Sequence, residues 1–584
     1  MDKTIDEANE LFRSQKILVF EPGEEEYERS VVTPNLLFRF SRPHLVIQPE
    51  DASHIQPIIK QARAQKLKIS IKCGGHSYAG HSTANKGISL DLRKINKVKL
   101  DIKSKIVTMD AGCNWGHVYK KLVNGRHNRF IINGGRCPFV GVSDFILGGS
   151  LSPFTRSFRM GCDTLEEDTV VTADGELVTV KDNDDSNSKK SKLFWALRGA
   201  GGCNFDILVK IKLKVQQLQN KEGVVVAGRY QWFLKSARIT NDLMNMINYF
   251  DLITTMNNFY TTDWPNQMTI DSTWMCNLQQ KEGDGVRFLV YYDGEKDEFD
   301  KLINKYIKQP ELAKQLKQRS LPEKPTASTA PSFSTTLITA TTIIWEEMKT
   351  FRRLYQGEKV QFLVTWIHSG GKAKEKEPSD TAFFWHEAMY HTHLTVDWED
   401  KWMERDMRGF LKEIKKKLRP FSLKRKAAFI NFANGELSKK AYEKAYFGNN
   451  REKLRHIKEI WNKDNFFEWN QGIQLPQGID DDGEDVDVDM PDKEKITDTI
   501  AKEQWENFET DDFVKDRKES VDNVDKLVKK HPILERFFKG KKNYIKELVQ
   551  KAADLKNDLC TSLGSKDLLP KTIKITLRQQ VIYC

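Results

Sequence analysis

The segment IKCGGHSYAG, residues 71–80, decides the fold, because a short β-branched run leads directly into a glycine loop. The alternation in KISIK (68–72) predicts a strand, and the glycines after it let the backbone approach a ligand closely. Two further glycine-rich segments follow at 134–150 and 199–204. Three such segments predict a nucleotide cofactor whose diphosphate is held by inward-pointing backbone N–H groups. None has the GxGxxG spacing of a Rossmann fingerprint, which disfavours a nicotinamide domain.

The bulk composition indicates a soluble globular chain of two or three domains. It has 584 residues, of which 39% are hydrophobic and 30% charged, and the mean hydropathy is −0.58. The N-terminal residues show no basic, apolar and small-residue signal pattern, and apolar runs such as FLVTWI (362–367) are too short for a membrane span. The eight cysteines are scattered without a CxxC pair. We therefore expect free thiols, no metal site and a cytoplasmic, intracellular location.

The charge balance gives little support for a nucleic-acid partner. The net charge is +11, but the excess is spread along the chain. Its densest run, KEIKKKLRPFSLKRK (412–426), alternates with apolar residues, as the solvated face of a helix does. We expect a small-molecule substrate and neither a nucleic-acid nor a membrane partner.

Hydrophobic periodicity and turn residues predict the elements. Residues 1–40 are expected to be a helical lead-in. Strands are expected at 44–50, 68–72, 87–95 and 105–112, helices at 51–67 and 115–125, and a hairpin at 164–180 around Asp174 and Gly175. From about 219 the glycine density falls and strands alternate with helices to 430, which indicates a separate α+β domain with an antiparallel sheet. Segment 324–336 is expected to be a loop. An acidic linker (480–492) precedes charged helical stretches.

Five motifs carry a family resemblance. They are IKCGGHSYAG (71–80), GGRCPFVGV (134–142), TLEEDTVVTADGELV (164–178), LFWALRGAGGCNF (193–205) and AYFGNNREKLRHIKEIWNKDNFFEWNQGIQLP (445–476). In this order, over about 25–478, they resemble the berberine-bridge-enzyme-like family, FAD-linked oxidases of the vanillyl-alcohol-oxidase superfamily.

The resemblance implies an α+β fold. It consists of a two-subdomain PCMH-type FAD-binding domain (1–218, completed by 425–478) and an α+β substrate domain with an antiparallel sheet (219–424). Residues 479–584 lie outside the resemblance, and we expect an acidic linker and a helical C-terminal extension that could bind a protein partner.

The resemblance also implies that FAD is attached twice, through His76 to the flavin 8α-methyl group and through Cys137 to C6. The bonds would raise the flavin potential, and molecular oxygen would reoxidise the flavin. The further residues expected to contact FAD are Gly74, Gly75, Ser77, Tyr78, Gly80, Gly141, Val142, Ser143, Gly148, Gly149 and Asn204.

Two departures from the family pattern bear on function. Asp144, Ser150 and Ser152 stand where glycines are usual, and a carboxylate at 144 would repel a diphosphate unless it points away. His81 is expected to be structural or on the surface. In AFINFAN (428–434), where relatives have a C-terminal strand with two tyrosines, Phe429 and Phe432 stand in their place and cannot accept a proton.

The segment FFWHEAMYHTHLTVDW (383–398) supplies the substitute bases. His391 and His393 are alternate residues of an expected strand and therefore share a face. We predict His391, His393 and Tyr390 as catalytic candidates, with His368 and His386 as further possibilities.

The sequence thus predicts an FAD-dependent oxidase of a small organic molecule, plausibly a secondary metabolite, that releases hydrogen peroxide. Two alternatives stay open: a flavin-binding cyclase whose FAD is structural or non-redox, and a catalytically degenerate cofactor-binding protein.

Overall fold

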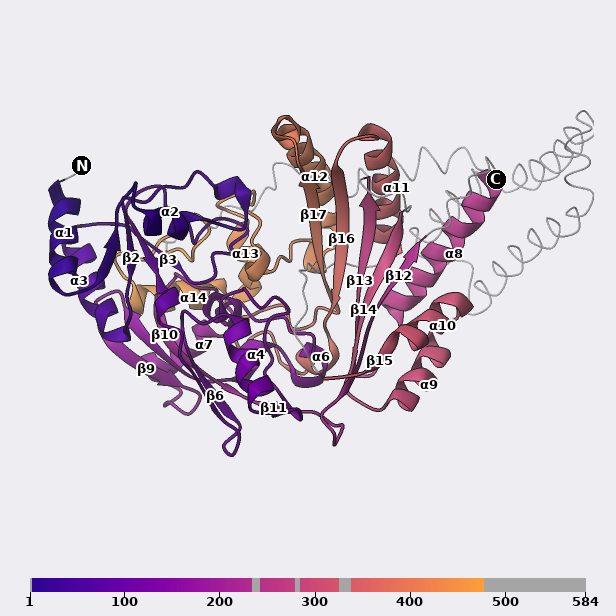
Figure 1. Cartoon of the computed structure of the whole chain (residues 1–584), viewed down its shortest axis with the longest axis horizontal. Coiled ribbons are helices and arrows are strands. Elements are labelled where there is room, and N and C mark those ends of the chain that lie inside the picture. Colours follow the sequence, from indigo (N-terminus) through magenta and orange to yellow (C-terminus); the bar gives the residue numbers. More distant parts are fainter. Residues whose placement is uncertain (1–2, 234–241, 279–283, 325–337, 477–584) are drawn as a thin grey trace, which may run out of the picture. The chain divides into compact units, whose positions relative to one another are not determined.

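The computed structural model describes residues 3–233, 242–278, 284–324 and 338–476 (Figure 1). Contacts between residues divide the chain after Ile479. The predicted acidic linker and helical extension, and nearly all of the loop predicted at 324–336, lie outside the described residues.

The first layer is a small sheet that ends at the glycine loop of residues 73–80. Its order is β1 (Leu18–Phe20), β2 (Leu45–Gln48), β4 (Ile88–Asp91) and β3 (Ile69–Lys72), with β1 antiparallel and the others parallel. Around it lie α1 (Lys3–Ser14), α2 (Glu25–Val31) and α3 (Ile55–Ala64). Asp51 accepts a hydrogen bond from the backbone of Ser53 and caps the turn that leads into α3. The prediction of a purely helical lead-in was wrong, because the apolar Leu18–Phe20 pairs with β2.

The second layer is an antiparallel sheet of five strands. Its order is β5 (Val98–Asp101), β6 (Ile106–Asp110), β10 (Asp206–Lys214), β8 (Leu165–Thr172) and β9 (Leu177–Lys181). The hairpin predicted around Asp174 and Gly175 joins β8 to β9, and Gly175 has a φ of +75°. Helices α4 (Trp115–Asn124), α5 (Val142–Leu147), α6 (Thr155–Phe158) and α7 (Lys189–Leu197) and the short pair β7 (Phe130–Ile131) and β11 (Gln216–Gln217) complete this part. One apolar core joins the two sheets.

The predicted α+β domain contains an antiparallel sheet of six strands. Its order is β15 (Ser320–Glu323), β12 (Val225–Phe233), β14 (Gly285–Tyr292), β13 (Met268–Asn277), β16 (Val360–His368) and β17 (Tyr390–Trp398). The helices of this part are α8 (Asp242–Thr261), α9 (Lys296–Tyr306), α10 (Pro310–Arg319), α11 (Ile338–Leu354) and α12 (Glu404–Leu418) (Figure 1). Large side chains of one sheet face, such as Trp274, Phe288 and Trp366, join the apolar core beneath these helices.

The chain then returns to the first half through residues 428–474. Within this segment Ile430–Phe432 forms a 3₁₀ turn, in which Phe432 N donates to Phe429 O at 3.0 Å. Helices α13 (Tyr442–Phe447) and α14 (Arg451–Trp461) follow. The backbone N of Ile473 donates to Oδ1 of Asn204 at 2.9 Å, so this segment is tied to the third glycine loop.

A buried arginine joins the two halves. Arg156 on α6 donates to the carbonyls of Met268, Trp264 and Ser369 at 2.7, 2.6 and 2.6 Å. A guanidinium matches several converging carbonyls because its donors form a rigid fork. Arg156 thereby fixes the six-stranded sheet against α6, which follows the glycine-rich segment 134–150.

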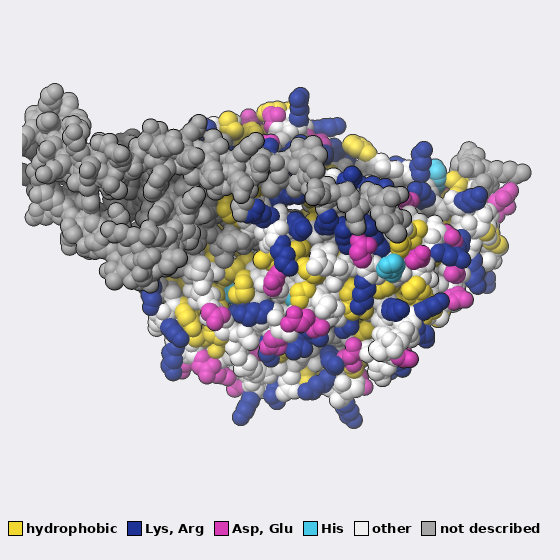
Figure 2. Space-filling model, turned by 180° about the vertical axis from the view of Figure 1, so that it is seen from behind, with side chains coloured by type: hydrophobic (Ala, Val, Ile, Leu, Met, Phe, Trp, Pro, Cys, Tyr) yellow, Lys and Arg dark blue, Asp and Glu magenta, His cyan; other side chains and the backbone are white. Residues whose placement is uncertain are grey.

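Charged side chains are distributed over the surface, as expected from their spread along the sequence. On the face shown in Figure 2, Lys and Arg side chains are interspersed with Asp and Glu rather than gathered in one patch. None of the described helices is both long and apolar enough to cross a bilayer.

Candidate cofactor site

His76 and Cys137 line one cavity of about 310 Å³. The loops that carry them cross at Gly74 and Gly141, where the backbones approach directly. A Cβ on Gly74 would lie 2.5 Å from the backbone N of Gly141, and a Cβ on Gly141 would lie 2.8 Å from the backbone N of Gly74. Any side chain at either position would separate the loops, so the two glycines bring the histidine and the cysteine to the same cavity.

The first loop is anchored from behind by a buried lysine. Nζ of Lys72, the last residue of β3, donates to the carbonyls of Ser30 and Val32 at 2.6 and 2.7 Å. Burial, and then the nearby charge of Lys72, lower the pKa of His76. The imidazole is therefore neutral at physiological pH, which is the form with a nucleophilic ring nitrogen.

The cavity collects many of the predicted cofactor contacts. Besides His76 and Cys137 it is lined by Gly74, Gly75, Ser77, Tyr78, Gly141 and Ser143. These residues come from the first two glycine segments, and Gly202 and Cys203 of the third segment line the cavity as well. Backbone from three segments around one cavity, with a neutral imidazole and a free thiol in its wall, fits a flavin nucleotide.

The other predicted contacts lie outside the lining of this cavity. Gly80, Val142, Gly148, Gly149 and Asn204 do not line the cavity. Val142 is fully buried in the core. A Cβ on Gly148 would collide with the amide of Asn431, and Asn204 donates to the carbonyls of residues 200–202 at 3.0–3.3 Å. The absence of a side chain at Gly148 and the amide group of Asn204 maintain the conformation of the loops.

Asp144, expected to repel a diphosphate unless it points away, has partners that compensate its charge. Its Oδ2 lies 3.1 Å from Nε2 of His81, and its Oδ1 accepts from the backbone N of Gly202 at 3.0 Å. On the other side of the imidazole, Nδ1 of His81 lies 2.7 Å from Oγ of Ser77. Burial alone would raise the pKa of Asp144, but His81 and the Gly202 N–H outweigh it, and the pKa is lowered.

This chain of hydrogen bonds, Ser77–His81–Asp144–Gly202, connects all three glycine segments. His81 lines the cavity, so its assignment as structural or on the surface missed its place beside the cofactor site. No spacing rule relates residue 81 to residue 144, and the sequence holds no signal for this contact.

A buried ion pair forms the wall between the cavity and the sheet. Nη2 of Arg136, the residue before Cys137, lies 2.7 Å from Oδ2 of Asp271 on β13. Their side chains are 3% and 4% exposed. Both charges are compensated, so the residue next to Cys137 is held by the other domain.

His393 packs behind two aromatic rings of the cavity wall and does not itself line the cavity. Its ring centroid lies 5.4 Å from that of Tyr78 and 5.7 Å from that of Phe432, and both of these line the cavity. Nδ1 of His393 lies 2.9 Å from Oγ1 of Thr395. Burial lowers the pKa of His393 to about 3, so the ring is neutral.

His391 shares this sheet face, as predicted, because Thr365 pairs with His393 and Ile367 with His391. It lies one layer further back, with its ring 4.9 Å from Phe429 and 6.3 Å from Phe383, and it does not line the cavity. Neither ring nitrogen has a partner among the described residues.

Tyr390 belongs to the opposite face of the strand. It stacks on His368 at 4.6 Å and lies in the core beneath the helices. This position separates Tyr390 and His368 from the cavity by the thickness of the sheet.

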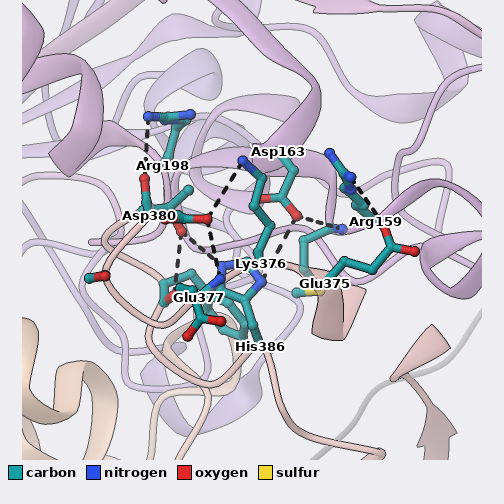
Figure 3. Close-up of polar contacts among 12 residues, drawn as sticks. Arg159, Asp163, Arg198, Glu375, Lys376, Glu377, Asp380 and His386 are labelled. Atoms are coloured by element: carbon teal, nitrogen blue, oxygen red, sulfur yellow. Dashed lines mark hydrogen bonds and ion pairs between the residues drawn. The ribbon is translucent and has the colours of Figure 1, made fainter. Parts of the chain in front are cut away.

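His386 belongs to a separate polar network (Figure 3). Its Nε2 lies 2.9 Å from Oγ1 of Thr381, and its Nδ1 lies 3.9 Å from Oδ2 of Asp163. Burial lowers the pKa of His386 to about 4 and raises that of Asp163 to about 6. The network holds the loop before β17 against the FAD part and does not reach the cavity.

Comparisons with known proteins agree with this site. Residues 43–181 match the family model described as FAD binding domain, and residues 428–474 match that described as Berberine and berberine like. The chain is 23% identical over 464 residues to the FAD-linked oxidoreductase YgaK of Bacillus subtilis (strain 168), which covers 74% of this chain and 91% of that protein. It is 29% identical over 176 residues to tetrahydroberberine oxidase of Argemone mexicana, covering 30% of this chain and 31% of that enzyme.

Solved structures show the same fold. Berberine bridge enzyme from Eschscholzia californica superposes with a TM-score of 0.66 at 17% identity, covering 82% of this chain and 100% of that one. A berberine-bridge-like protein of Physcomitrella patens gives 0.65 at 18% identity, covering 80% and 99%. Fold and cavity together define an FAD-binding oxidoreductase. Residues 43–181 and 428–474 thus carry the two domains that berberine-bridge-enzyme-like FAD-linked oxidoreductases combine, and the chain is similar to these proteins in both sequence and fold.

Proposed function

We propose that this protein is an oxidase of a small organic molecule, plausibly a secondary metabolite, in which FAD is bound covalently through both His76 and Cys137. The observation that carries the proposal is that both residues line one cavity, beside loops that cross without intervening side chains. Bound FAD supplies the two-electron oxidation of the substrate, with molecular oxygen as electron acceptor and hydrogen peroxide as product.

The cavity residues have distinct roles in this proposal. The neutral ring of His76 and the thiol of Cys137 are the attachment points. Cys73 and Cys203 also line the cavity, but burial raises the pKa of the Cys73 thiol to about 12, and burial raises the pKa of Cys203 still further. These two stay protonated and unreactive, because the thiolate is the nucleophilic form.

His393 is the proposed proton acceptor. It contacts the ring of Tyr78 at the cavity wall, and in the tautomer that donates from Nδ1 to Thr395 its Nε2 is an acceptor. Its low pKa means that it is neutral over the whole physiological range and is a weak base. Proton transfer is therefore favourable only as the substrate hydroxyl is oxidised.

Tyr78 and Phe432 complete the substrate side. Tyr78 is 41% exposed, and because the ordinary pKa of a phenol is about 10, its hydroxyl stays protonated at neutral pH and can donate a hydrogen bond to a substrate oxygen. The ring of Phe432 lies 5.6 Å from that of Tyr78 and provides an apolar contact that excludes water.

Intact-mass measurement tests the covalent attachment. The denatured wild-type protein should retain the added mass of FAD. Single His76→Ala and Cys137→Ala variants should retain it through the remaining bond, and the double variant should lose it. Cys73→Ser and the exposed His456→Ala serve as controls and should leave the mass unchanged. A double variant that still carries the full mass would contradict both assignments.

An oxygen electrode tests the oxidase activity. Alcohols, phenols and alkaloids should be screened for oxygen uptake and peroxide release by the flavin-loaded protein. A complete absence of uptake would argue against an oxidase.

The phenylalanines favour a second candidate, a cyclase with non-redox FAD. Phe429 is 2% exposed and packs on Phe432 at 5.3 Å, so the tyrosine positions of relatives form an apolar wall that could shape a substrate. Turnover that continues after the flavin is chemically reduced would support the cyclase, and strict dependence on oxidised flavin would exclude it.

A further inference from the structure

A second cavity, of about 640 Å³, lies between α4 with the loop after it and strands β12 and β14. Gly135 lines both this cavity and the cofactor cavity. The second cavity is otherwise built from different residues, and no part of the proposed oxidation uses it. Its volume is in the range of cavities that bind small organic ligands.

The walls of the second cavity are largely apolar. They include Leu122, Phe130, Ile132, Phe154, Val225 and Leu289. The first four come from the FAD part and the last two from the sheet, so the two domains face each other across the space. Transfer of an apolar ligand body from water to these walls is favourable in free energy.

Two arginines project from the sheet into this apolar space. Arg229 on β12 pairs with Leu289 on β14, and Arg287 is two residues from Leu289 on the same strand. Directly paired residues and residues two apart share a sheet face, so the two guanidinium groups lie on the face that lines the cavity.

The guanidinium of Arg287 has one long hydrogen bond and no counter-charge among the described residues. Its Nη2 makes a 3.5 Å hydrogen bond to Oγ1 of Thr273, and its buried Nε has no partner in the part of the chain that the structure describes. No described carboxylate pairs with Arg287 or Arg229 within 4.0 Å. Burial, and then the like charge of Arg229, lower the pKa of Arg287, as expected for a cation without compensation.

The other buried arginines of the same domain interface have a counter-charge or several acceptors, although Nε of Arg136 also has no hydrogen-bond partner among the described residues. Arg136 pairs with Asp271 at 2.7 Å, and Arg156 donates to several carbonyls. A half-buried guanidinium with one long hydrogen bond is an exception beside them. Buried charges are stabilised by a counter-charge with good geometry, and a forked guanidinium pairs best with a carboxylate, sulfonate or phosphate.

We infer that the second cavity binds an amphipathic anion, whose acidic group sits on Arg287 with Arg229 beside it and whose apolar body fills the space toward Phe130 and Phe154. The ligand is either a separate molecule or the remote acidic end of the substrate. The site goes beyond the proposed oxidation and stands whether or not that proposal holds.

Fluorescence titration of the full chain tests the site, with anilinonaphthalene sulfonate as the probe because it is an apolar anion. The wild-type protein should bind one equivalent saturably, and decanoate should displace it. Arg287→Gln should weaken binding about tenfold or more, the effect of losing a charge-assisted pair. Arg408→Gln, the same change on the exposed surface of α12, is the matched control and should bind as the wild type does.

A second variant covers the possibility that Arg287→Gln does not fold. Ala227 lines the cavity on β12, and Ala227→Phe should fill the space and abolish probe binding while both arginines stay in place. Absence of saturable binding by the wild type, or unchanged affinity in a folded Arg287→Gln or Ala227→Phe, would overturn the inference.

Turnover measurements with an identified substrate distinguish a separate ligand from the remote acidic end of the substrate. Decanoate that raises the KM of the wild type, and does so much less in Arg287→Gln, identifies the site as the acidic end of the substrate pocket. Decanoate that displaces the probe without changing KM identifies a separate ligand.

Discussion

Nε2 of His81 lies 3.1 Å from Oδ2 of Asp144, in a contact that links loops far apart in the sequence. Asp144→Asn keeps an oxygen for the N–H of Gly202 but removes the charge beside His81, and we expect it to destabilise the protein by about 1 kcal/mol at pH 7. The pKa of Asp144 is lowered by folding. Its contribution is therefore present above the ordinary value of 3.8 and is lost as the pH falls below it.

Chemical denaturation of wild type and Asp144→Asn at pH 7 and near pH 3 measures this contribution. The difference between them should shrink at the lower pH. A difference that does not change with pH would show that the carboxylate charge is not what stabilises the contact.

Removal of one charge of the buried pair Arg136–Asp271 should destabilise the protein more than removal of both charges. Asp271→Asn leaves the Arg136 guanidinium buried without a counter-charge, and we expect a loss of about 3–5 kcal/mol in the free energy of unfolding. The double variant Arg136→Met/Asp271→Leu removes both charges and should be more stable than Asp271→Asn. Urea unfolding of the three proteins decides this, and a double variant less stable than Asp271→Asn would contradict it.

Asp206, which lines the cofactor cavity, should oppose folding at neutral pH. Burial raises its pKa to about 8, and its Oδ2 has no hydrogen-bond partner among the described residues. A carboxyl whose pKa is raised by folding is favourable below its ordinary value of 3.8, and that contribution is lost as the pH rises toward about 8. Asp206→Asn should therefore raise the Tm, with a gain that grows from about pH 4 to pH 8.

The exposed Asp297→Asn is the control for Asp206→Asn and should show no such growth with pH. Thermal unfolding across this pH range provides the measurement. If Asp206→Asn lowers the Tm at pH 8, the carboxylate has a partner that stabilises its charged form.

His393→Gln tests the proposed proton acceptor. Glutamine can still hydrogen-bond to Thr395 but cannot take up a proton, so kcat/KM should fall about 100-fold or more while the flavin stays attached. With a pKa of about 3, His393 is neutral above about pH 4, and the wild-type profile should show no acidic limb from this residue near pH 6.5.

His391→Gln, on the same strand face but beside Phe429 and Phe383, which do not line the cavity, should reduce kcat/KM less than His393→Gln. Steady-state oxygen uptake with an identified substrate measures both. Wild-type kcat/KM in His393→Gln would exclude His393 as the base.

Local patterns predicted the fold well where elements depend on neighbours in the sequence. The hairpin around Asp174 and Gly175 and the antiparallel sheet follow from turn residues and alternation. The prediction failed at Leu18–Phe20, where a run of three residues pairs with β2. There a partner that is distant in the sequence decided the backbone conformation.

The sequence by itself determined that His76 and Cys137 stand in glycine loops, because glycine content and motif are properties of the chain. It also determined the shared face of His391 and His393, because strand alternation is local. Only the tertiary structure decided that the Gly74–Gly141 crossing brings His76 and Cys137 to one cavity, that His81 lies beside Asp144, and that Nε of Arg287 has no partner among the described residues. Each of these depends on how separate elements pack, and hydrogen bonds and ion pairs form by distance in space rather than by separation in sequence.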